Sequence, residues 1–217
     1  MSLLFKGVKS NTKRSALKGR ILQPFQKLQL RWSGRNELRT GRDAEAIGAG
    51  FLLSGRASYC GLYLNELVLR LLFKEDAHPA LFQAYSVALC GLSSVMDAMD
   101  SETILRRFER NLLAEIGFEI PLQYDTQGHS IAKEHWYRYE ADEGFCPVNL
   151  PLHPQMAAHC FSGEHILMID AENFDQPDVR KSAKRLMRLA LAPHLGNKPL
   201  ESRQLFIQHN PQQKDAR

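Results

Sequence analysis

The stretch that decides the fold is SYCGLYLNELVLRLL, Ser58 to Leu72, where the spacing of apolar residues becomes helical. Its apolar side chains recur at i, i+3, i+4, i+7 and i+8, at positions Leu64, Leu67, Val68, Leu71 and Leu72. This spacing places them on one face of an α-helix, and that face can be buried against other helices. The stretch therefore predicts an amphipathic helix that begins at about Arg56.

Further amphipathic helices are predicted on the C-terminal side of this stretch. Pro79 suits the first turn of a second helix, because the N–H that proline lacks has no partner there. Ser101 is the expected N-cap of a third helix, and Gly117 is the glycine expected just after its end. Later helices are predicted near Gly163, over 177–195 and over 199–208. Amphipathic helices joined by short links indicate a helical bundle.

The sequence before Arg56 is typical of strands joined by basic loops. Leu28, Leu30 and Trp32 alternate with polar residues, which is the period of a half-buried strand. Strands are also predicted over 2–8 and 37–46. Three strands are too few to make a stable closed sheet by themselves.

The segment 118–150 differs from the helices on either side of it. It is rich in aromatic residues and contains Gly128 and Gly144, which predicts a short β-hairpin or an irregular insert. The expected fold class is therefore α+β, with a strand-built domain at 1–50 and a mainly helical domain at 51–217 that carries the insert.

The net charge of +4 hides a strong asymmetry along the chain. Residues 1–42 hold eleven Lys or Arg and one acid, Glu37, whereas the rest of the chain has a net charge of −6. A solvated tail could also be basic, but here the cations are interleaved with Leu, Phe and Trp. The segment therefore predicts contact with nucleic acid, whose phosphates bind Lys and Arg. Its candidate DNA-binding residues are Lys6, Lys9, Lys13, Arg14, Lys18, Arg20, Arg31 and Arg35.

Aromatic rings in the same segment could stack on unpaired bases. The available rings are Phe5, Phe25 and Trp32. For any single ring we favour a core position, because aromatic side chains are usually buried.

A second group of cations lies on the helix expected after Pro177. Lys181, Lys184, Arg185 and Arg188 fall at i, i+3, i+4 and i+7, so they are expected to share one face. Such a face can simply be solvated, or it can contact DNA or an acidic peptide. We favour the contact, because almost no acid balances these cations.

The third helix carries Arg106, Arg107 and Arg110. These arginines could form surface ion pairs with Glu102 and Glu109, which contribute little to stability. An arginine beside an apolar groove could instead bind the C-terminal carboxylate of a partner.

Enzyme, metal and membrane functions find little support in the sequence. It contains no GxxxxGK[ST], GxGxxG or GxSxG motif. The spacing of His153, His159, Cys160 and His165 matches no standard zinc site. No apolar run approaches the length of a membrane span, and no cysteines form a close pair. We therefore expect a cytoplasmic protein that is not an enzyme and has no metal or cofactor.

Several segments together resemble the RecO family of bacterial recombination mediators, particularly its proteobacterial members. They run in order along nearly the whole chain: KGVKSNTKRSALKGRILQPFQKLQLRW (6–32), SYCGLYLNELVLRLL (58–72), LRRFERNLLAEIGF (105–118), YRYEADEGF (137–145) and AKRLMRLALAPHLGNKPLESRQLF (183–206).

The resemblance implies an N-terminal OB-fold β-barrel followed by a mainly helical domain. It also implies binding of single- and double-stranded DNA, annealing of complementary strands, and a nucleoid-associated location. Implied partners are RecR, the acidic C-terminal tail of single-stranded-DNA-binding protein and, indirectly, RecA. The LRRFE segment implies Arg106 as the contact for the tail carboxylate, with Arg107 as a second candidate. A protein-tail adaptor that binds little DNA is the alternative.

Two departures from the family pattern bear on these expectations. Many members carry paired CxxC zinc ligands in the insert, and residues 118–150 contain none. We therefore expect no zinc there and an insert held together by its aromatic residues. The family also begins well before KGVKS, so we expect either a misassigned start codon or a truncation, and an incomplete barrel of about two fewer strands.

Overall fold

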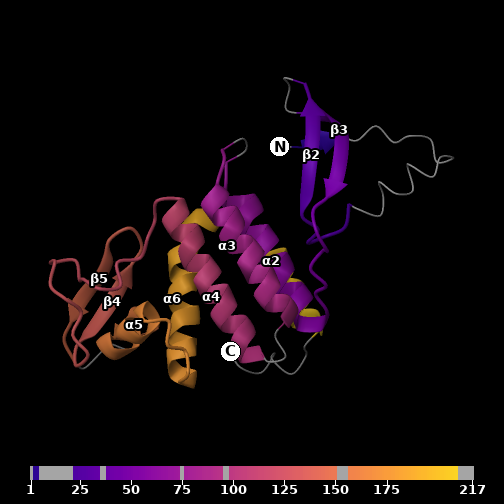
Figure 1. Cartoon of the computed structure of the whole chain (residues 1–217). Coiled ribbons are helices and arrows are strands. Elements are labelled where there is room, and N and C mark those ends of the chain that lie inside the picture. Colours follow the sequence, from indigo (N-terminus) through magenta and orange to yellow (C-terminus); the bar gives the residue numbers. More distant parts are fainter. Residues whose placement is uncertain are drawn as a thin grey trace. The chain divides into compact units, whose positions relative to one another are not determined.

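A computed structural model (Figure 1) describes residues 2–4, 22–34, 38–73, 76–94, 98–150 and 156–209. The chain divides into two compact units. The first unit is Met1–Ser54 with Phe73–Ala77, and the second is Gly55–Leu72 with His78–Arg217.

The first unit contains a three-stranded sheet in the order β1-β3-β2. β1 (Ser2–Leu4) pairs parallel to β3 (Leu38–Ala46), and β2 (Leu28–Ser33) pairs antiparallel to it. A register shift lies between Arg31 and Trp32. Within the described residues the sheet does not close into a barrel, which agrees with the predicted incomplete OB-fold.

The described side chains of this unit are mostly exposed or half-buried. Among the side chains described in the unit, Ala44 alone is buried. Trp32 keeps 43% of its surface exposed, so the core position favoured for this ring is wrong. The bulged register explains the difference, because a bulge lets Arg31 and Trp32 both face solvent where strict alternation would turn one inward.

The second unit is built on four packed helices, α2 (Gly55–Leu71), α3 (Pro79–Ser94), α4 (Ala98–Glu115) and α6 (Pro177–Leu195), as Figure 1 shows. The apolar stripe of the deciding stretch forms part of their core, since Leu64, Leu67 and Leu71 are buried. The order of helices and strands along the chain confirms the predicted α+β fold class.

The ends of α4 test two predictions made from single residues. Ser101 is not an N-cap, because α4 already begins at Ala98 and Ser101 is buried inside the helix. Gly117 does follow the helix end, with a φ of +86° that favours glycine. The N–H of Gly117 donates to the carbonyl of Ala114, and that of Phe118 donates to the carbonyl of Leu113. These two bonds form a Schellman motif.

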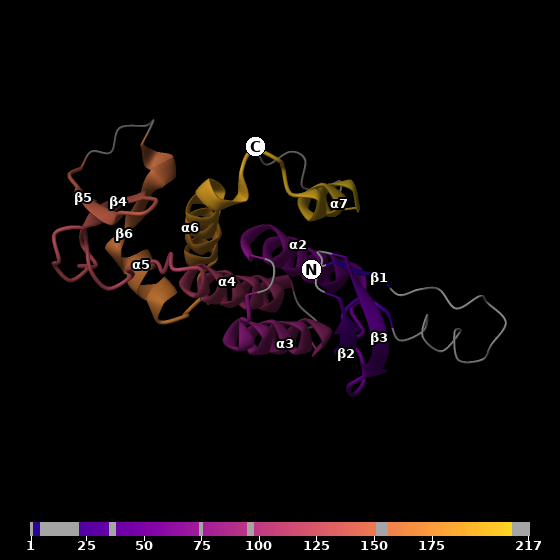
Figure 2. The same ribbon diagram turned by 90° about the horizontal axis from the view of Figure 1, so that it is seen from above.

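The insert forms a second, antiparallel sheet in the order β5-β4-β6, seen in Figure 2. Its strands are β4 (Trp136–Glu140), β5 (Gly144–Val148) and β6 (Cys160–Ser162). Tyr137, Phe145 and Phe161 are fully buried here, and the last two meet edge to face with centroids 6.3 Å apart. Buried aromatic side chains thus form much of the core of this sheet, and Phe161 contributes to it from outside the predicted insert of 118–150.

Shorter helices complete the second unit. A 3-10 turn (Ala157–His159) precedes β6, and α5 (Gly163–Asp170) follows it directly, capped by the hydroxyl of Ser162. The last helix, α7 (Glu201–His209), packs against α2. No helix in the described ranges is long and apolar enough to span a membrane.

Candidate binding surfaces

Most of the candidate DNA-binding residues at the N-terminal end lie outside the described residues. These are Lys6, Lys9, Lys13, Arg14, Lys18, Arg20 and Arg35. Arg31 is described, and it is exposed on β2 beside the exposed ring of Trp32. A cation next to an accessible indole is a suitable pair for a phosphate and its unpaired base.

The cationic stripe of α6 does not form one continuous surface. Lys181 is exposed and pairs with Asp178 at 2.9 Å, one turn earlier on the same helix. Lys184 reaches Glu102 of α4 at 3.5 Å, and Arg188 lies near Arg106 of α4.

Arg185 is turned away from the other three, toward the small sheet. Its guanidinium donates to the carbonyl oxygen of Cys160 at 2.6 Å and lies 4.4 Å above the ring of Phe161. A cation held between a strand carbonyl and an aromatic face contributes to packing. In this structure Arg185 joins α6 to β6.

Five cationic side chains from four helices gather instead at the junction of α2, α4, α6 and α7. We call them the cation cluster, and its members are Arg56, Arg106, Lys184, Arg188 and Arg203. The sequence predicts Arg106, Lys184 and Arg188 as binding residues but does not predict that they meet. It does not predict a binding role for Arg56 or Arg203.

Contacts and electrostatic effects define the cluster. Arg56 and Lys184 both approach Oε1 of Glu102, at 3.6 and 3.5 Å. The pKa of Arg188 is lowered, mainly because burial removes water from its guanidinium and to a smaller extent because Arg203 and Arg106 repel it. Glu102 and Glu109 face these five cations, so the cluster carries an excess of three positive charges.

Glu109 is the buried centre of the cluster. Its Oε1 accepts a hydrogen bond from the Tyr63 hydroxyl at 2.6 Å and pairs with Arg106 at 2.9 Å. Burial raises the pKa of Glu109, although Arg106 and the Tyr63 hydroxyl act in the opposite direction. The three residues join α2 to α4 through a polar network inside the helical core.

Arg106 and Arg107 occupy different environments. The Arg106 side chain is only 8% exposed, and its Nε is buried with no hydrogen-bond partner within the described residues. Arg106 also lines a shallow recess with Glu102, Thr103, Phe174, Arg180 and Lys184, and this recess is too small to hold a water molecule. A buried, unsatisfied donor beside other cations suits an incoming carboxylate.

Arg107 points toward the end of α5. It is exposed, and its Nε donates to Glu172 at 2.6 Å. Arg107 therefore lies apart from the cation cluster, and the structure does not bring the two predicted tail contacts together.

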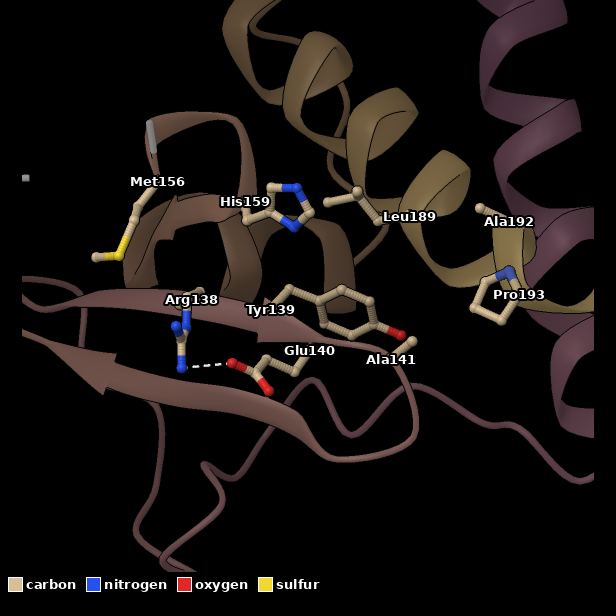
Figure 3. Close-up of a pocket in the computed structure, with 9 residues that line it drawn as sticks. All are labelled: Arg138, Tyr139, Glu140, Ala141, Met156, His159, Leu189, Ala192 and Pro193. Atoms are coloured by element: carbon tan, nitrogen blue, oxygen red, sulfur yellow. Dashed lines mark ion pairs between the residues drawn. The ribbon is translucent and has the colours of Figure 1, made fainter. Parts of the chain in front are cut away.

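A larger pocket of about 510 Å³ lies between β4 and the second half of α6 (Figure 3). Most of its lining is apolar, with Tyr139 on β4 and Leu189 and Pro193 on α6. Its charged residues, Arg138 and Glu140, form an ion pair with each other. None of the residues predicted for binding lines this pocket.

No group of three or more His, Cys, Asp or Glu side chains in the described ranges could hold a metal ion. All four cysteines are free thiols. Burial raises the pKa of Cys60 and of Cys160.

Comparison with known proteins identifies the chain's relatives. Residues 52–204 match the family described as "Recombination protein O C terminal". The DNA repair protein RecO of Dechloromonas aromatica (strain RCB) is 39% identical over 206 residues, which cover 95% of this chain and 83% of that protein. The DNA repair protein RecO of Pseudomonas aeruginosa (strain LESB58) is 38% identical over 197 residues, which cover 91% of this chain and 81% of the relative.

Fold and similarity together identify the family of the chain. The structure defines its class as an α+β protein with a small open sheet in one unit and a helical body with a β insert in the other. The chain belongs to the RecO family.

Proposed function

We propose that this chain is a DNA repair and recombination mediator of the RecF pathway that acts without making or breaking covalent bonds. It binds single- and double-stranded DNA and anneals complementary strands in the cytoplasm. With RecR, it promotes the loading of RecA onto DNA coated by single-stranded-DNA-binding protein. Membership of the RecO family supports the proposal, because the relatives are named DNA repair proteins.

The cation cluster is the observation that carries the proposal furthest. Its excess positive charge suits a ligand that ends in a carboxylate and has further acids nearby, and so does the Nε of Arg106, which has no hydrogen-bond partner among the described residues. The acidic C-terminal tail of single-stranded-DNA-binding protein has this chemistry. We assign the tail to the cluster, with Arg106 as the carboxylate contact.

Strand annealing is assigned to the N-terminal unit. Its lysines and arginines would neutralise the phosphates of two strands at once, which lowers their repulsion and raises their local concentration until bases pair. Arg31 and the exposed ring of Trp32 are the described part of this surface.

The second candidate function is a protein-tail adaptor that binds little DNA. It is favoured by one observation: the cations that gather among the described residues lie in the helical unit. Fluorescence anisotropy distinguishes the two functions, using labelled single-stranded DNA, labelled duplex and a labelled acidic peptide with an apolar C-terminal residue and a free carboxylate. A mediator binds all three, whereas an adaptor binds only the peptide.

Alanine variants connect each activity to its surface. A Lys184→Ala, Arg188→Ala double variant should lose peptide affinity, and Lys133→Ala, which removes an exposed lysine of the insert, should not. Replacing Lys13, Arg14 and Lys18 with Ala should slow strand annealing and flatten its dependence on salt. Unchanged peptide affinity would remove the cluster from the proposal, and an unchanged annealing rate and salt slope would remove Lys13, Arg14 and Lys18 from it.

A further inference from the structure

Two residues one turn apart on α2 hold the last helix in place. The carboxylate of Glu66 accepts hydrogen bonds from the backbone N–H groups of Glu201 and Ser202, both at 2.9 Å. It also accepts from the Ser202 hydroxyl at 2.6 Å. Arg70 donates to the same carboxylate at 2.5 Å and forms an ion pair with it.

This arrangement is a helix cap supplied from another helix. The first N–H groups of a helix have no partner within it, and a carboxylate placed there satisfies them and interacts favourably with the positive end of the helix dipole. Arg70 binds the chain just before the helix, since it donates to the carbonyl oxygens of Lys198 at 2.6 Å and Pro199 at 2.7 Å. Together Glu66 and Arg70 form a clamp on the entry to α7 and on its first turn.

The pKa of Glu66 shows that the clamp favours a charged carboxylate. Burial is the largest single effect and would raise the pKa of Glu66. The hydrogen bonds from Ser202 and Glu201 and the charge of Arg70 together outweigh burial, so the pKa is lowered. The carboxylate therefore carries its charge when it holds α7.

Arg203 and Phe206 of α7 lie beside residues of the cation cluster. Phe206 meets Tyr59 edge to face with centroids 6.1 Å apart, and the guanidinium of Arg56 lies 4.8 Å above the Phe206 ring. Arg203 follows Ser202 directly and lies close enough to Arg188 to lower its pKa. The clamp and the cluster are thus joined through a single short helix.

We propose that Glu66 is a positioning residue for the cation cluster: by capping α7 from α2, it holds Arg203 beside Arg188 and Phe206 beneath Arg56. This inference rests on the proposed binding of an acidic tail at the cluster. The Glu66 carboxylate contacts the first residues of α7, so we infer that Glu66 affects the tail only by placing that helix.

A double-mutant cycle on the full chain tests the proposal. The probe is the labelled acidic peptide with a free C-terminal carboxylate, titrated by fluorescence anisotropy. Glu66→Gln and Arg203→Ala should each weaken peptide binding about five-fold, as expected for the loss of a cap or of one charged contact. Combined, they should bind within about two-fold of Arg203→Ala alone, because Glu66 acts through the helix that carries Arg203.

Hydrogen exchange reports the cause of the change in affinity. Glu66→Gln should increase exchange at the amides of Glu201 and Ser202 while those of α4 stay protected. Glu201→Gln is the matched control, since it removes a carboxylate from the same turn that pairs with exposed Lys198. If Glu66→Gln does not fold, Ser202→Ala is the milder variant, because it removes only the 2.6 Å hydroxyl bond.

Each outcome of the cycle decides between the alternatives. Additive losses, or an unchanged affinity in Glu66→Gln, would overturn the positioning role while leaving the tail site in place. Failure of the unmodified chain to bind the peptide would overturn the proposed tail site and the positioning role with it.

Discussion

Tyr63 of α2 donates its hydroxyl proton to Glu109 of α4 over 2.6 Å, and the Glu109 carboxylate is fully buried. Burial, followed by the neighbouring carboxylate, raises the pKa of Tyr63 well above its usual value. The hydroxyl therefore stays protonated and remains a donor at neutral pH. With Arg106 on the other side, Glu109 has a charged and a neutral partner inside an apolar bundle.

Removing the Tyr63 hydroxyl should be more costly than removing a comparable hydroxyl elsewhere. We expect Tyr63→Phe to lower the free energy of unfolding by about 2 kcal/mol, because a buried carboxylate loses a donor. Tyr85→Phe is the matched control, since that hydroxyl donates to the neutral side chain of Asn65, and it should cost about 1 kcal/mol. Urea unfolding measures both variants. Equal losses would mean that the charge of Glu109 does not strengthen the bond.

The capping of α7 by Glu66 should make stability depend on pH in the acidic range. The pKa of Glu66 is lowered from its usual 4.5, so the folded chain binds this proton less tightly than the unfolded chain. The stabilisation is fully present above the unfolded pKa and is lost as the pH falls through the folded pKa. The free energy of unfolding should therefore drop below pH 4.5, and by less in Glu66→Gln.

Urea unfolding at a series of pH values from neutral to about 3 measures this difference. Glu109, whose raised pKa acts with the opposite sign, is present in both proteins and cancels in the comparison. Glu201→Gln should lose stability on acidification as the unmodified chain does. An identical loss in Glu66→Gln would show that the carboxylate does not stabilise the folded state.

Local patterns predicted the helices well, because each pattern depends on residues a few positions apart. The stripe of Leu64, Leu67 and Leu71 is buried as its spacing requires, and Gly117 ends α4 as expected. Ser101 failed as a cap because residues before it also adopt the helix, so the residue type alone did not fix the start of α4.

Charged residues were harder to place, because their partners are distant in sequence. The spacing predicted that Lys184 and Arg185 share one face of the helix that contacts DNA or an acidic peptide, but Arg185 instead contacts Cys160 and Phe161 of β6. Arg56 and Arg203 meet the other cluster residues only through the packing of α2 and α7. No local pattern marks such a meeting, and Glu66 as a cap for a helix so far along the chain is likewise visible only in three dimensions.

Arg185 should behave as a packing residue in stability measurements. We expect Arg185→Ala to lower the free energy of unfolding by about 2 kcal/mol, because it loses a charge-assisted hydrogen bond and a cation–π contact together. Lys181→Ala on the same helix removes only an exposed ion pair and should cost less than about 0.5 kcal/mol. Thermal and urea unfolding test the pair. A stable Arg185→Ala protein with weakened DNA binding would instead assign this residue to the nucleic-acid surface.

Trp32 and Arg31 should contribute to DNA binding in different ways if the N-terminal sheet holds single strands. Stacking on one base would make Trp32→Ala cost about 1–3 kcal/mol on single-stranded DNA, with little effect on duplex, whose bases are already stacked. Arg31→Ala should weaken both forms of DNA and lower the slope of log affinity against log salt by about 1, because one phosphate contact is lost. Fluorescence anisotropy over a salt series separates the two effects, and Lys133→Ala serves as a control for the loss of one surface charge. Equal weakening of single strands and duplex by Trp32→Ala would mean that the exposed ring supports the sheet and does not stack on bases.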